Sequence, residues 1–129
     1  MLKIDIEAEN KRLRKKSPID IIEWAITLSK KRVVTTSFGT YSSVLLSVIN
    51  KADKNMDVLW CDTGYNNYQT YKHAKNLIEK FNLNINIYTP NQTRGYIDVT
   101  LGLPTVDDPK HEYFTELVKL EPFRRALSE

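Results

Sequence analysis

Residues 33–49, with the sequence VVTTSFGTYSSVLLSVI, decide the fold. The first four residues are β-branched, and such a run favours a strand buried in a sheet. The polar segment 37–40, Ser-Phe-Gly-Thr, interrupts the run. From Tyr41 on, apolar residues recur at helical spacing and predict one apolar helix face: Val44, Leu45, Val48 and Ile49. The stretch therefore predicts a buried strand, a loop and an amphipathic helix.

The same alternation continues along the chain. Residues 56–61 form a second apolar strand, which Asp62-Thr63-Gly64 stops, and residues 67–81 show helical periodicity. Residues 83–88 alternate apolar and polar side chains, as expected for a strand nearer the sheet edge. Strand, helix, strand, helix, strand predicts a parallel sheet with right-handed crossovers. We expect an α/β fold with three α/β/α layers and a mainly parallel sheet.

The flanking segments predict further helices. Ser17-Pro18 has the cap and first-turn proline of a helix start, and this helix should end near Lys30-Lys31. Residues 96–103 are compatible with a short helix or a loop. Residues 107–117 and the segment from Glu121-Pro122 predict short helices at the C-terminus.

Size and composition indicate one domain over residues 1–129, with 41% hydrophobic residues, 27% charged residues and a net charge of +3. The basic arm at residues 11–16 predicts a solvated helix face and a mobile terminus, and without interleaved aromatic residues it does not indicate nucleic-acid binding. The charged N-terminus and the lack of a long apolar run predict a cytoplasmic protein without a membrane segment. Cys61 is the only cysteine, which excludes an internal disulfide and a multi-thiolate metal site. We expect Cys61 to be a small core residue.

The loop after the first strand is the first candidate site. Ligands of open α/β sheets bind beyond the carboxyl ends of the strands, and a helix N-terminus attracts phosphate or sulfate. Gly39 permits close approach of the backbone to an anion, and neighbouring hydroxyl groups add donors. An ordinary turn with Ser and Thr caps explains the spacing equally well. The loop lacks the second glycine and the Gly-Lys-Ser/Thr ending of a Walker motif.

Four patches in order resemble the phosphoadenosine phosphosulfate (PAPS) reductase family. They are Thr36-Ser37-Phe38-Gly39, the stretch from Leu59 to Tyr65, the pair Thr70-Tyr71, and Lys119-Leu120-Glu121-Pro122 followed by Arg125-Ala126-Leu127. The family has an adenine-nucleotide α-hydrolase-like fold with a modified pyrophosphate-binding loop. Its members form an S-sulfocysteine from PAPS, which thioredoxin or glutaredoxin resolves to release sulfite in sulfate assimilation.

The resemblance implies a substrate-binding set on two loops. The first loop would cradle the phosphosulfate through Ser37, Phe38, Gly39, Thr40 and Ser42. The second would lie against the nucleoside through Asp62, Thr63, Gly64 and Tyr65. Arg94 follows the third strand, where it either pairs with a phosphate or is a solvated loop arginine. The expected ligand is PAPS or its product adenosine 3′,5′-bisphosphate, and a homodimer is expected.

Departures from the family pattern limit what this sequence implies. The Glu-Cys-Gly-x-His motif with the catalytic cysteine does not occur in the sequence, so no catalytic residue is assigned. The sequence is then either the first half of a longer protein or a naturally short gene product. The paired cysteines of the iron–sulfur branch are missing around residues 113–119, which favours the cluster-free, PAPS-using branch without a bound cofactor. Tyr68 and Gln69 replace a Pro-Glu pair of the family.

Two other functions stay open. One is a non-catalytic nucleotide-binding or dimerising module derived from such a reductase. The other is an ATP pyrophosphatase of the related Ser-Gly-Gly-x-Asp-Ser type, which Phe38 and Tyr41 disfavour because they replace a glycine and the acidic residue. His73 and His111 have no ligand-spaced partner, so no metal site is expected, and both should be exposed to solvent.

Overall fold

The computed structural model describes residues 4–129, and it confirms the predicted alternation of parallel strands and helices. The three strands pair in the order β1-β2-β3, and both pairs are parallel. Thr35 lies level with Leu59, and Trp60 lies level with Ile87. The elements of this unit are β1 (Val33–Thr35), α3 (Ser42–Ala52), β2 (Asp57–Cys61), α4 (Tyr68–Phe81) and β3 (Asn84–Tyr88).

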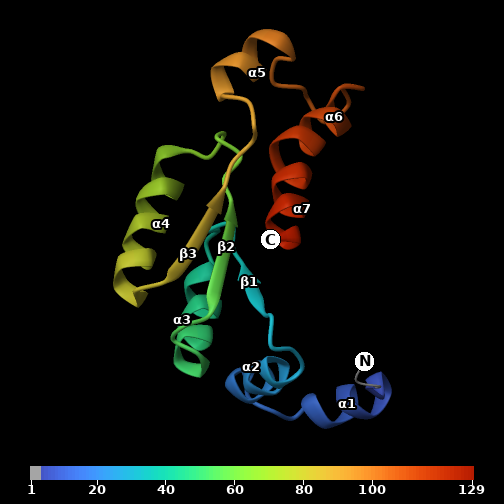
Figure 1. The fold of residues 1–129 in the computed structure, drawn as a ribbon, viewed down its shortest axis with the longest axis vertical. Helices are drawn as coiled ribbons and strands as arrows, with labels where there is room; N and C mark the ends of the chain where they lie inside the picture. The colour runs from blue at the N-terminus through green and yellow to red at the C-terminus, as the bar shows by residue number, and fades with distance from the viewer. Residues whose placement is uncertain (1–3) are drawn as a thin grey trace.

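Helices cover both faces of the sheet, so the predicted three-layer α/β/α arrangement is confirmed. Helices α3 and α4 lie on one face, and α7 (Glu121–Ser128) packs on β2 and β3 from the other (Figure 1). Because parallel strands need crossover connections, helices on the faces are the expected consequence of this topology.

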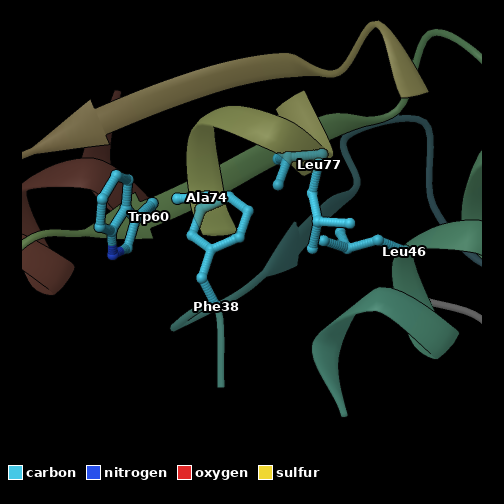
Figure 2. Close-up of a cluster of buried hydrophobic side chains, with 6 residues drawn as sticks. Phe38, Leu46, Trp60, Ala74 and Leu77 are labelled. Atoms are coloured by element: carbon cyan, nitrogen blue, oxygen red, sulfur yellow. The ribbon is translucent and has the colours of Figure 1, made fainter. Parts of the chain in front are cut away.

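The main core lies between the sheet and the α3–α4 layer. Side chains alternate along a strand, so Val58 and Trp60 of β2 point to this layer while Leu59 and Cys61 point to α7. Figure 2 shows side chains of this core cluster, to which the loop after β1 contributes Phe38. Its buried members are Phe38, Leu46, Val58, Trp60, Ala74 and Leu77.

The prediction that the first strand is buried is wrong. β1 is an edge strand, and Val33 keeps 44% of its surface exposed. Only Val34 is partly buried and packs against the core. β-branched residues indicate that a segment is extended, whereas its burial depends on which strands and helices pack on either side of it. The expectation that residues 83–88 lie at a sheet edge is confirmed by β3.

The N-terminal region is helical over most of its described length. The basic arm at residues 11–16, expected to be a solvated face and a mobile terminus, begins in the last turn of α1 (Ile6–Leu13), of which only Leu13 is buried. Helix α2 (Pro18–Thr27) starts as predicted, with Ser17 and Asp20 forming a reciprocal capping box. It ends at Thr27, before the two lysines that were expected to close it.

The C-terminal third is more regular than predicted. Residues 96–103, for which helix and loop were both open, contain most of α5 (Arg94–Thr100). The helix predicted from residue 107 begins only at α6 (His111–Thr115) and runs through a π-helical turn, η1 (Glu116–Leu120), into α7. The Glu121 amide donates to the Glu116 carbonyl, five residues back. Pro122 has no N–H to continue the α-helical pattern, which explains a wider turn directly before it.

Candidate functional site

Three loops meet at the carboxyl edge of the sheet, where ligands of open α/β folds bind. Residues 36–41 follow β1, residues 62–67 follow β2 and residues 89–93 follow β3. Most of the predicted site residues lie on the first two loops, Ser42 opens α3, and Arg94 is the first residue of α5. The parallel topology therefore brings all of the predicted positions to one edge.

The loop after β1 is anchored in the core by Phe38. This residue has a left-handed backbone, with φ of 52°, and only 2% of its surface is exposed. Its ring packs edge-on against Trp60 at 4.9 Å between centroids, and its N–H donates to the Thr36 hydroxyl at 3.1 Å. Phe38 therefore fixes the loop from the core side, and its side chain is not available to a ligand.

The rest of this loop faces outward. Ser37, Gly39 and Thr40 are exposed, while the Ser42 amide and hydroxyl both donate to the Gly39 carbonyl, at 3.0 and 2.6 Å. A Cβ at Gly39 would meet the Ser37 hydroxyl oxygen at 3.7 Å, so it would point into the space that Ser37 faces. The N-cap residue of α3, Tyr41, makes no side-chain cap within the described part of the chain. The loop thus presents the Ser37 hydroxyl beside a helix N-terminus that has no side-chain cap, although the Ser42 amide is already bonded to the Gly39 carbonyl.

Asp62 organises the loop after β2. Its Oδ1 accepts three hydrogen bonds, from the Gly64 amide at 3.0 Å, the Asn66 side-chain amide at 3.0 Å and the Tyr71 hydroxyl at 2.9 Å. Gly64 takes a φ of +78°, which glycine adopts without a Cβ penalty. Burial and the Asp62 carboxylate together raise the pKa of Tyr71. The predicted Asp-Thr-Gly turn is therefore a rigid polar turn, tied back to α4.

Tyr65 and Arg94 lie against one another. The Arg94 guanidinium carbon sits 4.8 Å from the Tyr65 ring centroid, and the Tyr65 hydroxyl donates to Asp98 on α5 at 2.7 Å. On its other side, the Tyr65 ring meets Phe114 edge-on at 5.1 Å. Burial and the Asp98 carboxylate raise the pKa of Tyr65 to about 12. Arg94 is thus not a freely solvated loop arginine.

A cavity of about 220 Å³ lies between the second and third loops. It brings together Asp62, Thr63, Gly64 and Arg94 of the predicted set with residues 89–93. The residues of the first loop do not line it; they lie on the exposed surface at the same edge. The two halves of the predicted site are therefore a small cavity and a separate exposed loop.

A larger hollow of about 650 Å³ lies toward the opposite end of the sheet, with Lys30, Asp57, Asn86 and the end of α7 in its wall. None of the predicted site residues lines it. We place the candidate site at the carboxyl edge, because the loops that follow parallel strands converge there. The larger hollow is lined mainly by the segments before β1 and β2 and by the end of α7.

Helix α7 is tied to the third loop through Arg125. Its guanidinium donates to the Thr89 carbonyl at 2.7 Å and to Glu121 at 2.9 Å. The Arg125 side chain lowers the pKa of Glu121. This pair gives a structural role to the segment around residues 119–127, which the sequence analysis matched to a family motif.

Cys61 lies at the end of β2 on the α7 side and is partly buried, somewhat less enclosed than a core residue. Burial raises the pKa of its thiol. His73 and His111 are both partly buried, so the prediction of solvent-exposed histidines is wrong. Among residues 4–129, no cluster of three or more His, Cys, Asp or Glu residues is arranged to hold a metal ion. None of the helices in the same range has the length and apolar character needed to cross a bilayer.

Sequence reasoning missed Asp98, Asn66 and Phe114 as part of this edge. Asp98 joins Tyr65 across 33 residues of sequence, and nothing in the local pattern predicts such a contact. The one available signal was the Arg94–Asp98 spacing of four, typical of a pair on one helix face.

Comparison with known proteins shows which family the sequence and the fold of this chain resemble. Residues 31–129 match the family model described as phosphoadenosine phosphosulfate reductase domain. A phosphoadenosine 5'-phosphosulfate reductase of Synechococcus sp. is 30% identical over 123 residues, covering 93% of this chain and 53% of the relative. The corresponding protein of Thiocapsa roseopersicina is 32% identical over 120 residues, covering 92% and 50%. The chain therefore spans about half the length of these relatives.

Solved structures agree with the sequence comparisons. The PAPS reductase of Candida auris, in a phosphate complex, superimposes with a TM-score of 0.84 at 25% identity, over 99% of this chain and 63% of that one. An NH3-dependent NAD synthetase from Campylobacter jejuni shares the fold at a TM-score of 0.55 and 16% identity, over 96% of this chain and 50% of that one.

Proposed function

The chain belongs to the phosphoadenosine phosphosulfate reductase family, and from that premise we propose that it binds an adenine nucleotide carrying a phosphosulfate, or the matching bisphosphate, at the carboxyl edge of its sheet. The observation that carries the proposal is the exposed pair Ser37 and Gly39 beside a helix N-terminus without a side-chain cap, in a loop that buried Phe38 anchors to the core. Such a site supplies N–H groups and a hydroxyl to a negatively charged group. Ser37, Phe38, Gly39, Thr40 and Ser42 would form this cradle, with Ser37, Gly39 and Thr40 as its exposed members and Phe38 as its anchor.

The cavity between the second and third loops would take the nucleoside part. Its walls combine polar groups, such as those of Asp62 and Arg94, with apolar surface, and the rigid Asp62 turn fixes their shape before a ligand arrives. Thr63, Gly64 and Tyr65 would border the ligand, and Arg94 would face its phosphate groups. A turn that is ordered in advance lowers the entropic cost of binding.

The proposed reaction is the reduction of PAPS to sulfite in sulfate assimilation. A cysteine thiolate attacks the sulfur of PAPS, the bond from sulfur to the phosphate oxygen breaks, and adenosine 3′,5′-bisphosphate leaves. The resulting S-sulfocysteine is reduced by a dithiol protein such as thioredoxin or glutaredoxin, which becomes a disulfide as sulfite departs. No bound cofactor or iron–sulfur cluster takes part, and the reducing cytoplasm is the compartment that suits this chemistry.

Cys61 is not suited to be that nucleophile. It ends a strand, and burial raises the pKa of its thiol, which keeps it protonated near neutral pH. The attacking thiolate would therefore come from a residue outside residues 1–129.

A second candidate is a non-catalytic, nucleotide-binding module that forms a homodimer. The open edge of the sheet supports it, because Val33 of β1 is 44% exposed and β1 has a partner strand on one side only. Sedimentation equilibrium tests the self-association that this module requires: a monomer at high concentration counts against it.

Calorimetric titration tests the proposed ligand. Adenosine 3′,5′-bisphosphate, AMP and ATP are titrated into the wild type, Ser37→Ala and the control Ser47→Ala, which lies on α3 outside the loop. We expect selective binding of the bisphosphate, weakened about fivefold to tenfold by Ser37→Ala because one charge-assisted hydrogen bond is lost. The control should bind as the wild type does. If none of the three nucleotides binds, the proposal is refuted.

A further inference from the structure

A carboxylate on α5 connects the loop after β2 to the first residue of α5 without lining the cavity beside them. Asp98 accepts the Tyr65 hydroxyl on Oδ1 at 2.7 Å, and its Oδ2 lies 3.5 Å from the Arg94 Nε. One oxygen therefore holds the loop after β2, and the other holds the first residue of α5. Asp98 is not among the residues that form the wall of the 220 Å³ cavity.

Arg94 is held from three directions. Asp98 pairs with its Nε, the Tyr65 ring lies 4.8 Å from its guanidinium carbon, and the Gly64 carbonyl accepts from its Nη1 at 3.4 Å. Its side chain nevertheless keeps 57% of its surface exposed. The guanidinium is therefore fixed in place while one side stays open toward the cavity that Arg94 lines.

The same contacts hold the loop after β2. Tyr65 is fixed at its hydroxyl by Asp98 and at its ring by Arg94 and by Phe114, which lies on α6. Gly64 precedes it in a left-handed conformation, with its amide held by Asp62, so the contacts of Tyr65 extend the order of this turn toward α5. An isolated exposed ion pair at a spacing of four contributes little, but here the ion pair is part of a network of several contacts that joins α5, α6 and the loop.

We propose that Asp98 is a positioning residue of the nucleotide site, which holds the loop after β2 through Tyr65 and presents Arg94 to the anionic part of the ligand. The loop-ordering part of this inference concerns the free protein, and the ligand-binding part rests on the proposed function. Asp98 itself does not touch the nucleotide.

Hydrogen exchange of the free protein tests the loop-ordering part. The variants are Asp98→Ala, Asp98→Asn and Tyr65→Phe, and the control is Glu79→Ala, which removes another exposed ion pair of the same spacing on α4. We expect the amides of residues 63–66 to exchange about tenfold faster in Asp98→Ala. The backbone amides that form the hydrogen bonds pairing strand β2 with strand β3 should keep their exchange rates. Asp98→Asn should have a smaller effect, because its carbonyl still accepts from Tyr65. Tyr65→Phe removes only the hydroxyl group that donates to Asp98, so exchange of the same amides should become about fivefold faster.

The outcomes of this experiment separate the alternatives. Unchanged exchange in residues 63–66 of Asp98→Ala overturns the inference and makes the cluster an ordinary surface ion pair. A rise in exchange over the whole sheet also overturns it, since that result indicates global destabilisation. Equal effects of Asp98→Ala and Asp98→Asn would contradict the assignment of the Tyr65 hydroxyl bond as the ordering contact.

Titration of adenosine 3′,5′-bisphosphate into the same variants tests the binding part. We expect about tenfold weaker binding by Asp98→Ala and unchanged binding by Glu79→Ala. If the wild type binds and Asp98→Ala binds equally well, the positioning role is refuted while the proposed function stands. If the wild type does not bind at all, the proposed function and the binding part both fall, and hydrogen exchange alone decides the ordering part.

Discussion

Phe38 provides the sharpest test of how the first loop is held, because one side chain joins this loop to the core. The ring is 2% exposed and packs edge-on against Trp60, within the cluster that fills the space between the sheet and α3–α4. Replacing a buried phenylalanine by alanine costs about 3–5 kcal/mol, the lost aromatic pair included. Because Phe38 enters the core from a loop that can partly relax, we expect about 3–4 kcal/mol for Phe38→Ala.

That cost converts into a large shift of the melting temperature. Unfolding entropies of ~2.1 cal/mol/K per residue amount to ~0.27 kcal/mol/K for 129 residues. Phe38→Ala should therefore lower Tm by about 11–15 °C, measured by circular dichroism or calorimetry. The matched control is Tyr41→Ala in the same loop, where 83% of the residue's surface is exposed and the change should stay within about 0.5 kcal/mol.

Two results would refute this reasoning. A loss of less than ~1.5 kcal/mol for Phe38→Ala, or a loss equal to that of Tyr41→Ala, would mean that the loop is not anchored in the core. Phe38→Gly adds an independent test, since the residue has a φ of 52°. Compared with alanine, glycine avoids the left-handed backbone penalty of about 1–2 kcal/mol, but it loses about 0.5–1 kcal/mol through the greater entropy of its unfolded chain. Phe38→Gly should therefore be at least as stable as Phe38→Ala.

Three further predictions concern the polar groups of the edge. Asp62→Ala should lower the free energy of unfolding, measured in urea, by about 2–3 kcal/mol, because three partly buried donors, among them the Tyr71 hydroxyl, lose their acceptor. Asp62→Asn should lower it by about half as much, and equal losses for the two variants would contradict this prediction. The pKa of Tyr65 is raised to about 12 from about 10, so the neutral phenol favours the folded state and its contribution, present below pH 10, is lost as the pH rises toward 12. Tyr65→Phe should lack that alkaline loss in pH-dependent unfolding, and identical profiles would exclude the Asp98 contact. The Cys61 thiol, whose pKa is raised by burial, should react with iodoacetamide more slowly at pH 8 than the same thiol in urea, as followed by mass spectrometry, and equal rates would show that it is exposed.

The repeating elements could be predicted because each carries its own local signal. Helices α3 and α4 follow from apolar periodicity, and the start of α2 follows from Ser17 and Pro18. The burial of β1 could not be predicted in the same way. Its β-branched residues indicate an extended segment, but residues 33–36 do not determine how many strands and helices pack beside it.

The helix at the C-terminus shows a second kind of limit. Pro122 correctly indicated a boundary, and two separate helices were the simplest interpretation. The chain instead keeps one helical path by widening a single turn, so that the Glu121 amide reaches the Glu116 carbonyl. Whether a proline ends a helix or only perturbs it depends on packing, and here α7 is held against β2 and β3.

The predicted site residues form two groups that are held by different forces. The first loop is fixed by burial of Phe38, an apolar anchor that is part of the global core. The second loop is fixed by hydrogen bonds to two carboxylates, Asp62 and Asp98, at the partly exposed edge. Because core packing supports the whole domain while edge contacts act locally, Phe38→Ala should unfold the protein earlier, whereas Asp98→Ala should loosen one loop in a protein of nearly unchanged Tm. Neither contact follows from the sequence pattern: Phe38 was assigned to the substrate-binding loop, not to the core, and Tyr65 and Asp98 meet from the loop after β2 and from α5.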